Sequence, residues 1–136
     1  MRKSACTVAL AVSLAAGGCS ITSPTPVVAL GPWGGSHLSM DVTSTGARLE
    51  YDCADGVIEE PLRPDADGRF TATGVHTPGH GGPVRAGDVL PALRARYEGR
   101  IYGERMTLLV TLTETGVVLG SFELQRGSSG RLVRCL

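Results

Sequence analysis

The sequence predicts an all-β protein, a small eight-stranded antiparallel meander that closes into a barrel, preceded by an N-terminal signal segment. Apolar and polar residues alternate with a period of two in several windows, and turn residues separate these windows at short intervals. No window has the spacing of an amphipathic helix. Strands joined in order by tight turns are antiparallel neighbours, and closure into a barrel removes their free edges. A two-sheet β-sandwich is the alternative.

Eight segments are expected to be strands, and most connections between them are tight turns such as Thr115-Gly116. Trp33 is expected at the start of the first strand, whose alternation is clear from His37 to Val42. The following strands are expected at 47–53, 57–62, 69–75, 93–102, 106–113, 118–124 and 131–136, with Asp55-Gly56 as a turn.

The inward-facing positions of these strands are large and apolar, so they are expected to fill the barrel without a sizeable ligand cavity. They are Leu38, Met40, Leu49, Tyr51, Phe70, Tyr97, Ile101, Leu108, Val110, Phe122 and Leu124. The connection at 77–91 is the long one, rich in glycine and proline. Because recognition often uses a long loop on a rigid scaffold, this loop is a candidate binding surface.

The chain is expected to divide into a signal peptide with a lipobox at 1–19, a tether at 20–32 and the barrel domain at 33–136. The tether contains Ser-Pro and Thr-Pro pairs that favour an extended chain. This organisation is typical of an exported protein.

The first residues have the three parts of a secretory signal. A basic start precedes an apolar run at 5–16, which is too short to remain as a membrane anchor. The segment that ends at Cys19 resembles a bacterial lipobox, with Ala16 where leucine is usual. We therefore expect export to the periplasm or outer surface, with a lipid on Cys19 as the only membrane contact. Ordinary cleavage near Ala16 or Gly18 is the alternative.

Two cysteines remain in the expected mature domain, Cys53 and Cys135, because Cys6 and Cys19 lie in the signal segment. In a small exported domain two cysteines most simply form a disulfide with each other.

The charge balance argues against several functions. The full chain has 13 basic and 13 acidic residues, and loss of Arg2 and Lys3 leaves 11 arginines, no lysine and a formal balance of −2. Without lysine, Schiff-base chemistry is excluded. The mature chain also lacks the basic footprint of a nucleic-acid-binding domain, so no nucleic-acid partner is expected.

The long loop carries three candidate partner-binding residues, His76, His80 and Arg85, at one end of the barrel. Two loop histidines without a carboxylate motif do not supply the three or four converging ligands of a metal site. We therefore expect no metal and no cofactor, and two exposed loop histidines.

Arg94, Arg96 and Arg100 lie on one face of a single expected strand. An anion- or partner-binding face is one interpretation, because arginine is favoured at interfaces. The other is a solvated face on which Glu98 and Glu123 balance the arginines across strands.

Short motifs along the domain resemble an uncharacterised family of small exported bacterial β-barrel proteins and lipoproteins, and this resemblance brings no activity with it. The motifs are Trp33-Gly34-Gly35, Tyr51-Asp52-Cys53, Gly82-Pro83-Val84-Arg85, Ala95-Arg96-Tyr97, Met106-Thr107-Leu108, Thr111 to Gly116 and Cys135-Leu136. Gly31-Pro32-Trp33 also resembles the Gly-x-Trp opening of lipocalins and related calycin barrels, in which the tryptophan closes the barrel end.

A looser likeness is to the periplasmic lipoprotein inhibitors of c-type lysozyme, which are eight-stranded barrels with a Tyr-x-Cys strand bridged to a cysteine near the C-terminus. Tyr51-Asp52-Cys53, Ala95-Arg96-Tyr97 and Cys135 match this outline. The inhibitory loop of that family uses a serine and a lysine, and the mature chain here has no lysine.

We expect an exported cell-envelope lipoprotein that is a non-enzymatic binding module for an envelope protein or a small ligand. The alternative is an inhibitor of a secreted hydrolase such as lysozyme. An enzyme is a third hypothesis with little support, because Ser128 and Ser129 lack the Gly-x-Ser-x-Gly elbow. The adjacent Glu59 and Glu60 point to opposite strand faces and do not form a dyad.

Lipidation predicts a mature chain that begins with a modified Cys19. Mass spectrometry of the N-terminal peptide of protein from a bacterial expression host is expected to show a diacyl or triacyl mass addition on this residue. Substitution of Cys19 by serine is the control and is expected to release the protein from the membrane fraction. An unmodified N-terminal peptide in the native-sequence protein would contradict the prediction.

Overall fold

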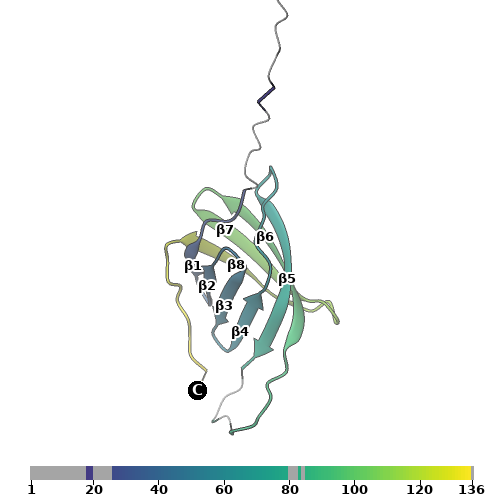
Figure 1. Ribbon diagram of the computed structural model, residues 1–136. Helices are drawn as coiled ribbons and strands as arrows, with labels where there is room; N and C mark the ends of the chain where they lie inside the picture. Colours follow the sequence, from purple (N-terminus) through teal and green to yellow (C-terminus); the bar gives the residue numbers. More distant parts are fainter. Residues whose placement is uncertain (1–17, 20–25, 80–82, 84, 136) are drawn as a thin grey trace, which may run out of the picture.

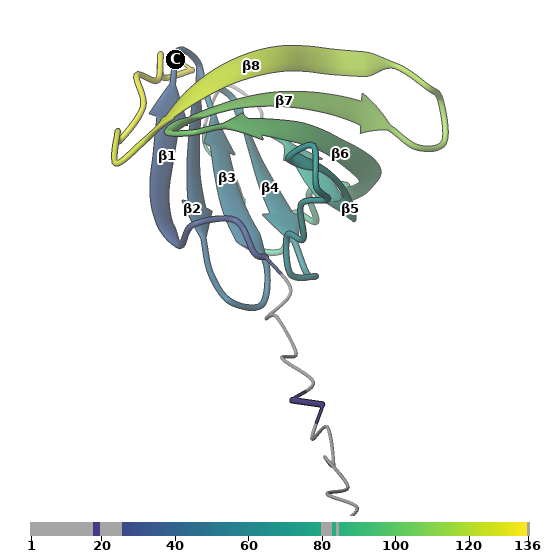
Figure 2. The same ribbon diagram turned by 90° about the horizontal axis from the view of Figure 1, so that it is seen from above.

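Eight antiparallel strands follow one another in chain order around a closed barrel, and β1 pairs with β8 to complete the ring (Figure 1 and Figure 2). The computed structural model describes residues 18–19, 26–79, 83 and 85–135. Its strands are β1 (Gly31–Gly35), β2 (Leu38–Val42), β3 (Ala47–Tyr51), β4 (Ala54–Ile58), β5 (Arg69–Pro78), β6 (Leu93–Tyr102), β7 (Arg105–Leu112) and β8 (Val118–Arg126). The predicted barrel is confirmed over the sandwich alternative.

The expected signal peptide lies outside the described residues, apart from Gly18 and Cys19, which are both exposed. Within the described ranges, no helix has the length and hydropathy needed to cross a membrane.

The first and last strands differ from those expected, although the number of strands is right. Residues 31–35 form a separate strand, because His37 takes a φ of 68° and turns the chain into β2. The expected strand at 131–136 instead makes an isolated bridge between Arg131 and Ser36. A turn at a histidine leaves no mark in the alternation of apolar and polar residues. The prediction therefore treated β1 and β2 as one strand.

The strand expected at 57–62 begins earlier, because Asp55-Gly56 lies inside β4 rather than in a turn. A Cβ atom at Gly56 would lie 2.9 Å from the Tyr97 hydroxyl and 3.3 Å from the Tyr51 ring. Glycine is therefore required at this position for close packing in the barrel interior.

One barrel end, which we call the tether end, is closed by residues 26–30 and the connection 59–68. Val28 is 1% exposed and its N–H donates to the carbonyl of Leu62 at 3.1 Å. The indole N–H of Trp33 donates to the carbonyl of Ala29 at 2.9 Å. The expected tether at 20–32 thus extends too far, because the folded barrel already includes Val28 and all of β1.

The barrel interior is filled by side chains, as the alternation predicts. Nine of the eleven expected inward residues are buried, and the other two, Ile101 and Phe122, are partly buried and pack against the same core. Trp33, Ile58, Met106 and Val28 complete this core. The packing leaves the outer surface as the main place for recognition.

Residues 127–135, which we call the C-terminal strap, fold back over the outer face of β1. The N–H of Arg131 donates to the carbonyl of Gly35 at 2.8 Å, and the N–H of His37 donates to the carbonyl of Arg131 at 2.8 Å. A Cβ atom at Gly34 would lie 2.1 Å from the nitrogen of Gly130, so the strap requires glycine there.

The predicted disulfide between Cys53 and Cys135 is present, with the two Cα atoms 5.4 Å apart. It joins the end of the strap to the turn between β3 and β4, rather than joining two strands as expected. The bridge therefore holds the strap against the barrel.

Removal of the bridge by substitution of Cys135 with serine is expected to lower the free energy of unfolding. The two cysteines are 82 residues apart in sequence. Loss of a cross-link over such a loop costs on the order of 4 kcal/mol in the chain-entropy model. Urea unfolding followed by tryptophan fluorescence measures the change. A soluble form with Cys19 replaced by serine is the parent for both proteins, and equal stability of the two would contradict the prediction.

Candidate functional site

The expected loop site at the barrel end is not assembled as predicted. His76 is a buried residue of β5, 7% exposed, because the ladder with β6 continues to His76 and the ladder with β4 to Pro78, beyond the expected strand end at residue 75. His80 lies outside the described residues. Arg85 is exposed in the connection 79–92, where its backbone N–H donates to the Asp88 carboxylate at 3.0 Å. His76 and Arg85 therefore belong to different environments.

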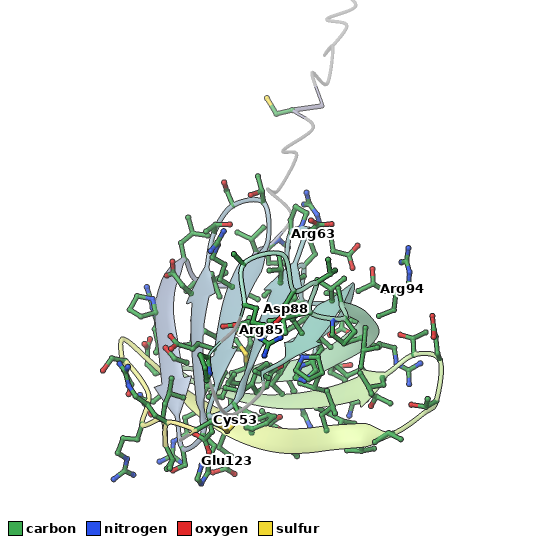
Figure 3. All side chains as sticks on the ribbon, turned by 90° about the horizontal axis from the view of Figure 1, so that it is seen from below. Cys53, Arg63, Arg85, Asp88, Arg94 and Glu123 are labelled. Carbon is green, nitrogen blue, oxygen red and sulfur yellow. A yellow bond between two sulfur atoms is a disulfide. The ribbon has the colours of Figure 1, made fainter. Side chains whose placement is uncertain are left out.

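Figure 3 looks at this barrel end and shows residues 85–92 crossing in front of the barrel opening, with Arg85 and Asp88 upon them. In Figure 1 the same residues extend beyond the strands, away from the tether end. We call this end of the barrel the loop end.

His76 contributes to a polar cluster inside the barrel near the loop end. Its ring packs edge-on against Tyr51 with the ring centroids 5.0 Å apart, and Tyr51 packs in the same way against Phe122 at 5.6 Å. The Tyr97 hydroxyl donates to the carbonyl of Val75 at 2.8 Å. The Tyr51 hydroxyl and His76 Nδ1 have no hydrogen-bond partner among the described residues.

Burial controls the protonation of this cluster. It raises the pKa of the Tyr51 phenol far above its ordinary value, to which the neighbouring Tyr97 adds, and it raises the pKa of Tyr97 to about 12. Burial lowers the pKa of His76, against a smaller opposite effect of Asp55. The cluster is therefore neutral at pH 7. The strand alternation itself places His76 inward with Phe70 and Ala72, a sign that the prediction of a loop overlooked.

Across the described residues, no three His, Cys, Asp or Glu side chains are grouped so that they could hold a metal ion.

The predicted arginines of β6 lie on the outer surface, where the register brings two more arginines beside them. We call Arg69, Arg94, Arg96, Arg100 and Arg105 the arginine face. Arg69 stands directly opposite Arg100 on the neighbouring strand, and Arg105 stands opposite Tyr102. Figure 3 shows the Arg94 side chain projecting away from the barrel.

The carboxylates expected to balance these arginines do so only in part. Arg96 Nε lies 3.5 Å from a Glu98 oxygen, and both side chains are about half exposed. Glu123 is level with Thr107 rather than beside an arginine. Among the described residues, Arg69, Arg94, Arg100 and Arg105 make no ion pair. The Arg100 guanidinium instead stacks on the Tyr102 ring, 4.6 Å from its centroid.

Charge is divided between the two sides of the barrel. Residues 31–68, which include β1–β4, have eight acidic and two basic side chains, a net charge of −6. Residues 69–126, which include β5–β8, have five acidic and seven basic side chains, a net charge of +2. Figure 2 shows β1–β4 on one side and β6–β8 curving over the other.

A groove of about 960 Å³ separates the outer face of β7 and β8 from the C-terminal strap. We call it the strap groove. The row Tyr102, Arg105 and Gln125 forms part of its lining, in register across β6, β7 and β8, and the next position in that row is Gly34 of β1. Arg131 of the strap also lines the groove. Sequence alternation locates this row on the outside but does not reveal the strap beside it.

Asp52 connects the C-terminal end of the strap to the barrel. One carboxylate oxygen accepts the N–H of Val133 at 2.7 Å, and the other lies 2.5 Å from His37 Nδ1. The Val133 N–H is the main cause of the lowered pKa of Asp52, and His37 contributes to it. The strap is thus fixed by Asp52 as well as by the disulfide.

Comparison of the chain with models of protein families, with curated proteins and with solved structures finds no match. The function is therefore proposed from the residues of this chain.

Because the pKa of His76 is lower in the folded chain than in the unfolded chain, the unfolded chain binds more protons in weak acid. The free energy of unfolding is therefore expected to fall as the pH drops from 7.5 through 6.5 to 5. Replacement of His76 by phenylalanine is expected to flatten this decrease in urea titrations. Replacement of Asp52 by asparagine is the control, since the Val133 N–H lowers the pKa of its carboxyl and the carboxyl therefore affects stability only in stronger acid. The same slope in the wild type and the His76→Phe variant would contradict the assignment.

Proposed function

We propose that this protein is an exported, lipid-anchored binding module of the cell envelope that holds an anionic partner on its arginine face. The observation that carries the proposal is the group of four arginines that make no ion pair among the described residues. The expected export, the lipid on Cys19 and the absence of catalysis are parts of the same proposal.

The placement of Arg69 opposite Arg100 supports binding rather than stability. Like charges directly opposite each other on neighbouring strands destabilise a sheet. The guanidinium groups present several donors in a fixed plane, which suits carboxylate, sulfate and phosphate groups. An anionic partner would relieve the repulsion between Arg69 and Arg100, and this relief would contribute favourably to the free energy of binding.

The connection 79–92 is a second proposed contact surface, because it carries Arg85 and is held on a closed barrel. Since His76 is buried in β5, the expected group of His76, His80 and Arg85 no longer supports a single site there. The arginine face is therefore the primary proposal.

An inhibitor of a secreted hydrolase is the second candidate. It is supported by the disulfide from the β3–β4 turn to the C-terminal strap within an eight-stranded barrel, the outline that the lysozyme inhibitors share. A direct assay of lysozyme activity with added protein separates this candidate from a binding module that leaves the enzyme active.

Reversal of two exposed arginines tests the arginine face. The double variant Arg94→Glu and Arg96→Glu is expected to bind immobilised polyglutamate or polygalacturonate about tenfold more weakly at low salt, the effect of roughly 1.4 kcal/mol from a few exposed charge pairs. Binding of the wild type is expected to weaken as salt is raised.

The double variant Arg48→Glu and Arg63→Glu is the matched control, because it makes the same change of charge at exposed positions on the other half of the barrel. It is expected to bind like the wild type. Equal weakening in both double variants would show that net charge, rather than the arginine face, governs binding and would refute the proposal.

A further inference from the structure

We propose that the anionic partner is an acidic polysaccharide and that the strap groove holds one of its sugar units. This inference rests on the proposed function of the arginine face and adds the class of ligand.

The groove exists because the strap lies close to β1 and is held there at its far end. Gly34 has no side chain, so the strap lies directly on the outer face of β1 instead of standing away from it. The disulfide and the Asp52 contact with Val133 then fix the far end of the strap. The groove therefore has a fixed wall before any ligand arrives, which lowers the entropic cost of binding.

The lining has the chemistry of a sugar site. Tyr102 is 50% exposed although Arg100 stacks on its ring, so part of the aromatic surface is open to a ligand. The C–H groups of a sugar ring pack well on an aromatic surface, while its hydroxyls need donors and acceptors around them. Arg105, Gln125 and Glu123 supply both kinds of group from two neighbouring strands.

The groove is continuous with the arginine face. Arg100 stacks on Tyr102 at the groove and stands opposite Arg69 on its other side. An extended anionic chain with one unit at Tyr102 would therefore reach Arg100 and Arg69 with the acidic groups of the next units.

The surface around the arginines favours a polysaccharide over an acidic polypeptide. Protein interfaces rely on an apolar centre with a few large buried anchors. The arginines here are instead interspersed with hydroxyl side chains, since Thr71, Thr73, Thr107 and Thr111 share the outer face of β5 and β7. Of the exposed apolar residues near them, Val117 lies in the turn between β7 and β8, and Val118 is the first residue of β8, opposite Thr111. Hydroxyl groups and arginines suit a hydrated chain of sugars with acidic groups.

The test compares oligogalacturonate, sulfated dextran oligomers, oligoglutamate and a neutral glucose oligomer at equal length and low salt, by calorimetry on the full domain. We expect at least one acidic saccharide to bind about tenfold or more tightly than oligoglutamate, which has the carboxylates of oligogalacturonate without its sugar rings. The two acidic saccharides distinguish carboxylate from sulfate as the acidic group, and either result supports the inference. The neutral oligomer is expected to bind at least tenfold more weakly than the preferred acidic one.

Tyr102 is the residue on which this preference depends. The Tyr102→Ala variant is expected to lose the preference for saccharide over oligoglutamate, and the Tyr102→Phe variant is expected to keep most of it because the ring remains. Val118→Ala is the matched control, since it removes an exposed apolar side chain from the other end of the same surface. Unchanged melting temperatures establish that the variants are folded.

Two negative outcomes separate this inference from the proposed function. Equal binding of saccharide and oligoglutamate, with no effect of Tyr102→Ala, would refute the sugar site and leave a purely electrostatic face. Failure to bind any of the anionic oligomers at low salt would refute the proposed function as well.

Discussion

The ring of strands closes where β8 meets β1, and this contact is narrow. β8 has nine residues and β1 has five, yet they pair only at Trp33 with Arg126 and at Gly34 with Gln125. The C-terminal strap reinforces the closure from outside, since it leaves β8, lies on β1 and ends in the bridge to Cys53. The strap contact needs a β1 without a side chain at Gly34. The seam is therefore fixed by a glycine and a cross-link rather than by a long ladder of hydrogen bonds.

The same seam forms the wall of the candidate site, so stability and recognition are coupled. Any change that lifts the strap from Gly34 would also open the strap groove beside Tyr102, Arg105 and Gln125. The barrel interior has a different role, because its packed side chains hold β5–β8 in the register that brings Arg69 to Arg100. The core thus positions the arginines without taking part in the proposed contact.

The pattern of the sequence was enough to predict the barrel and its inward residues, which follow from local alternation and tight turns, and the disulfide, which follows from there being one possible pair of cysteines in the expected mature domain. Alternation places Leu38 or Tyr97 inside whatever the exact pairing of strands. The strap, the turn at His37 and the burial of His76 were missed. The strap depends on contacts between distant parts of the chain, and the turn at His37 depends on an unusual backbone angle. The burial of His76 depends on how far the hydrogen-bonded pairing of β5 continues. The row Arg94, Arg96 and Arg100 was found by alternation, but its neighbour Arg69 requires the register of β5 on β6.

The division of charge between the two sides of the barrel gives the molecule a permanent electric dipole moment across its width. Near an extended negative surface, such a dipole experiences a torque that turns the β5–β8 side toward the surface before contact occurs. The orienting field acts over about 10 Å at 0.1 M salt and over longer distances in more dilute media. Rotation during approach thus reduces the number of unproductive collisions, and the rate of capture would depend on ionic strength more steeply than the lifetime of the bound state.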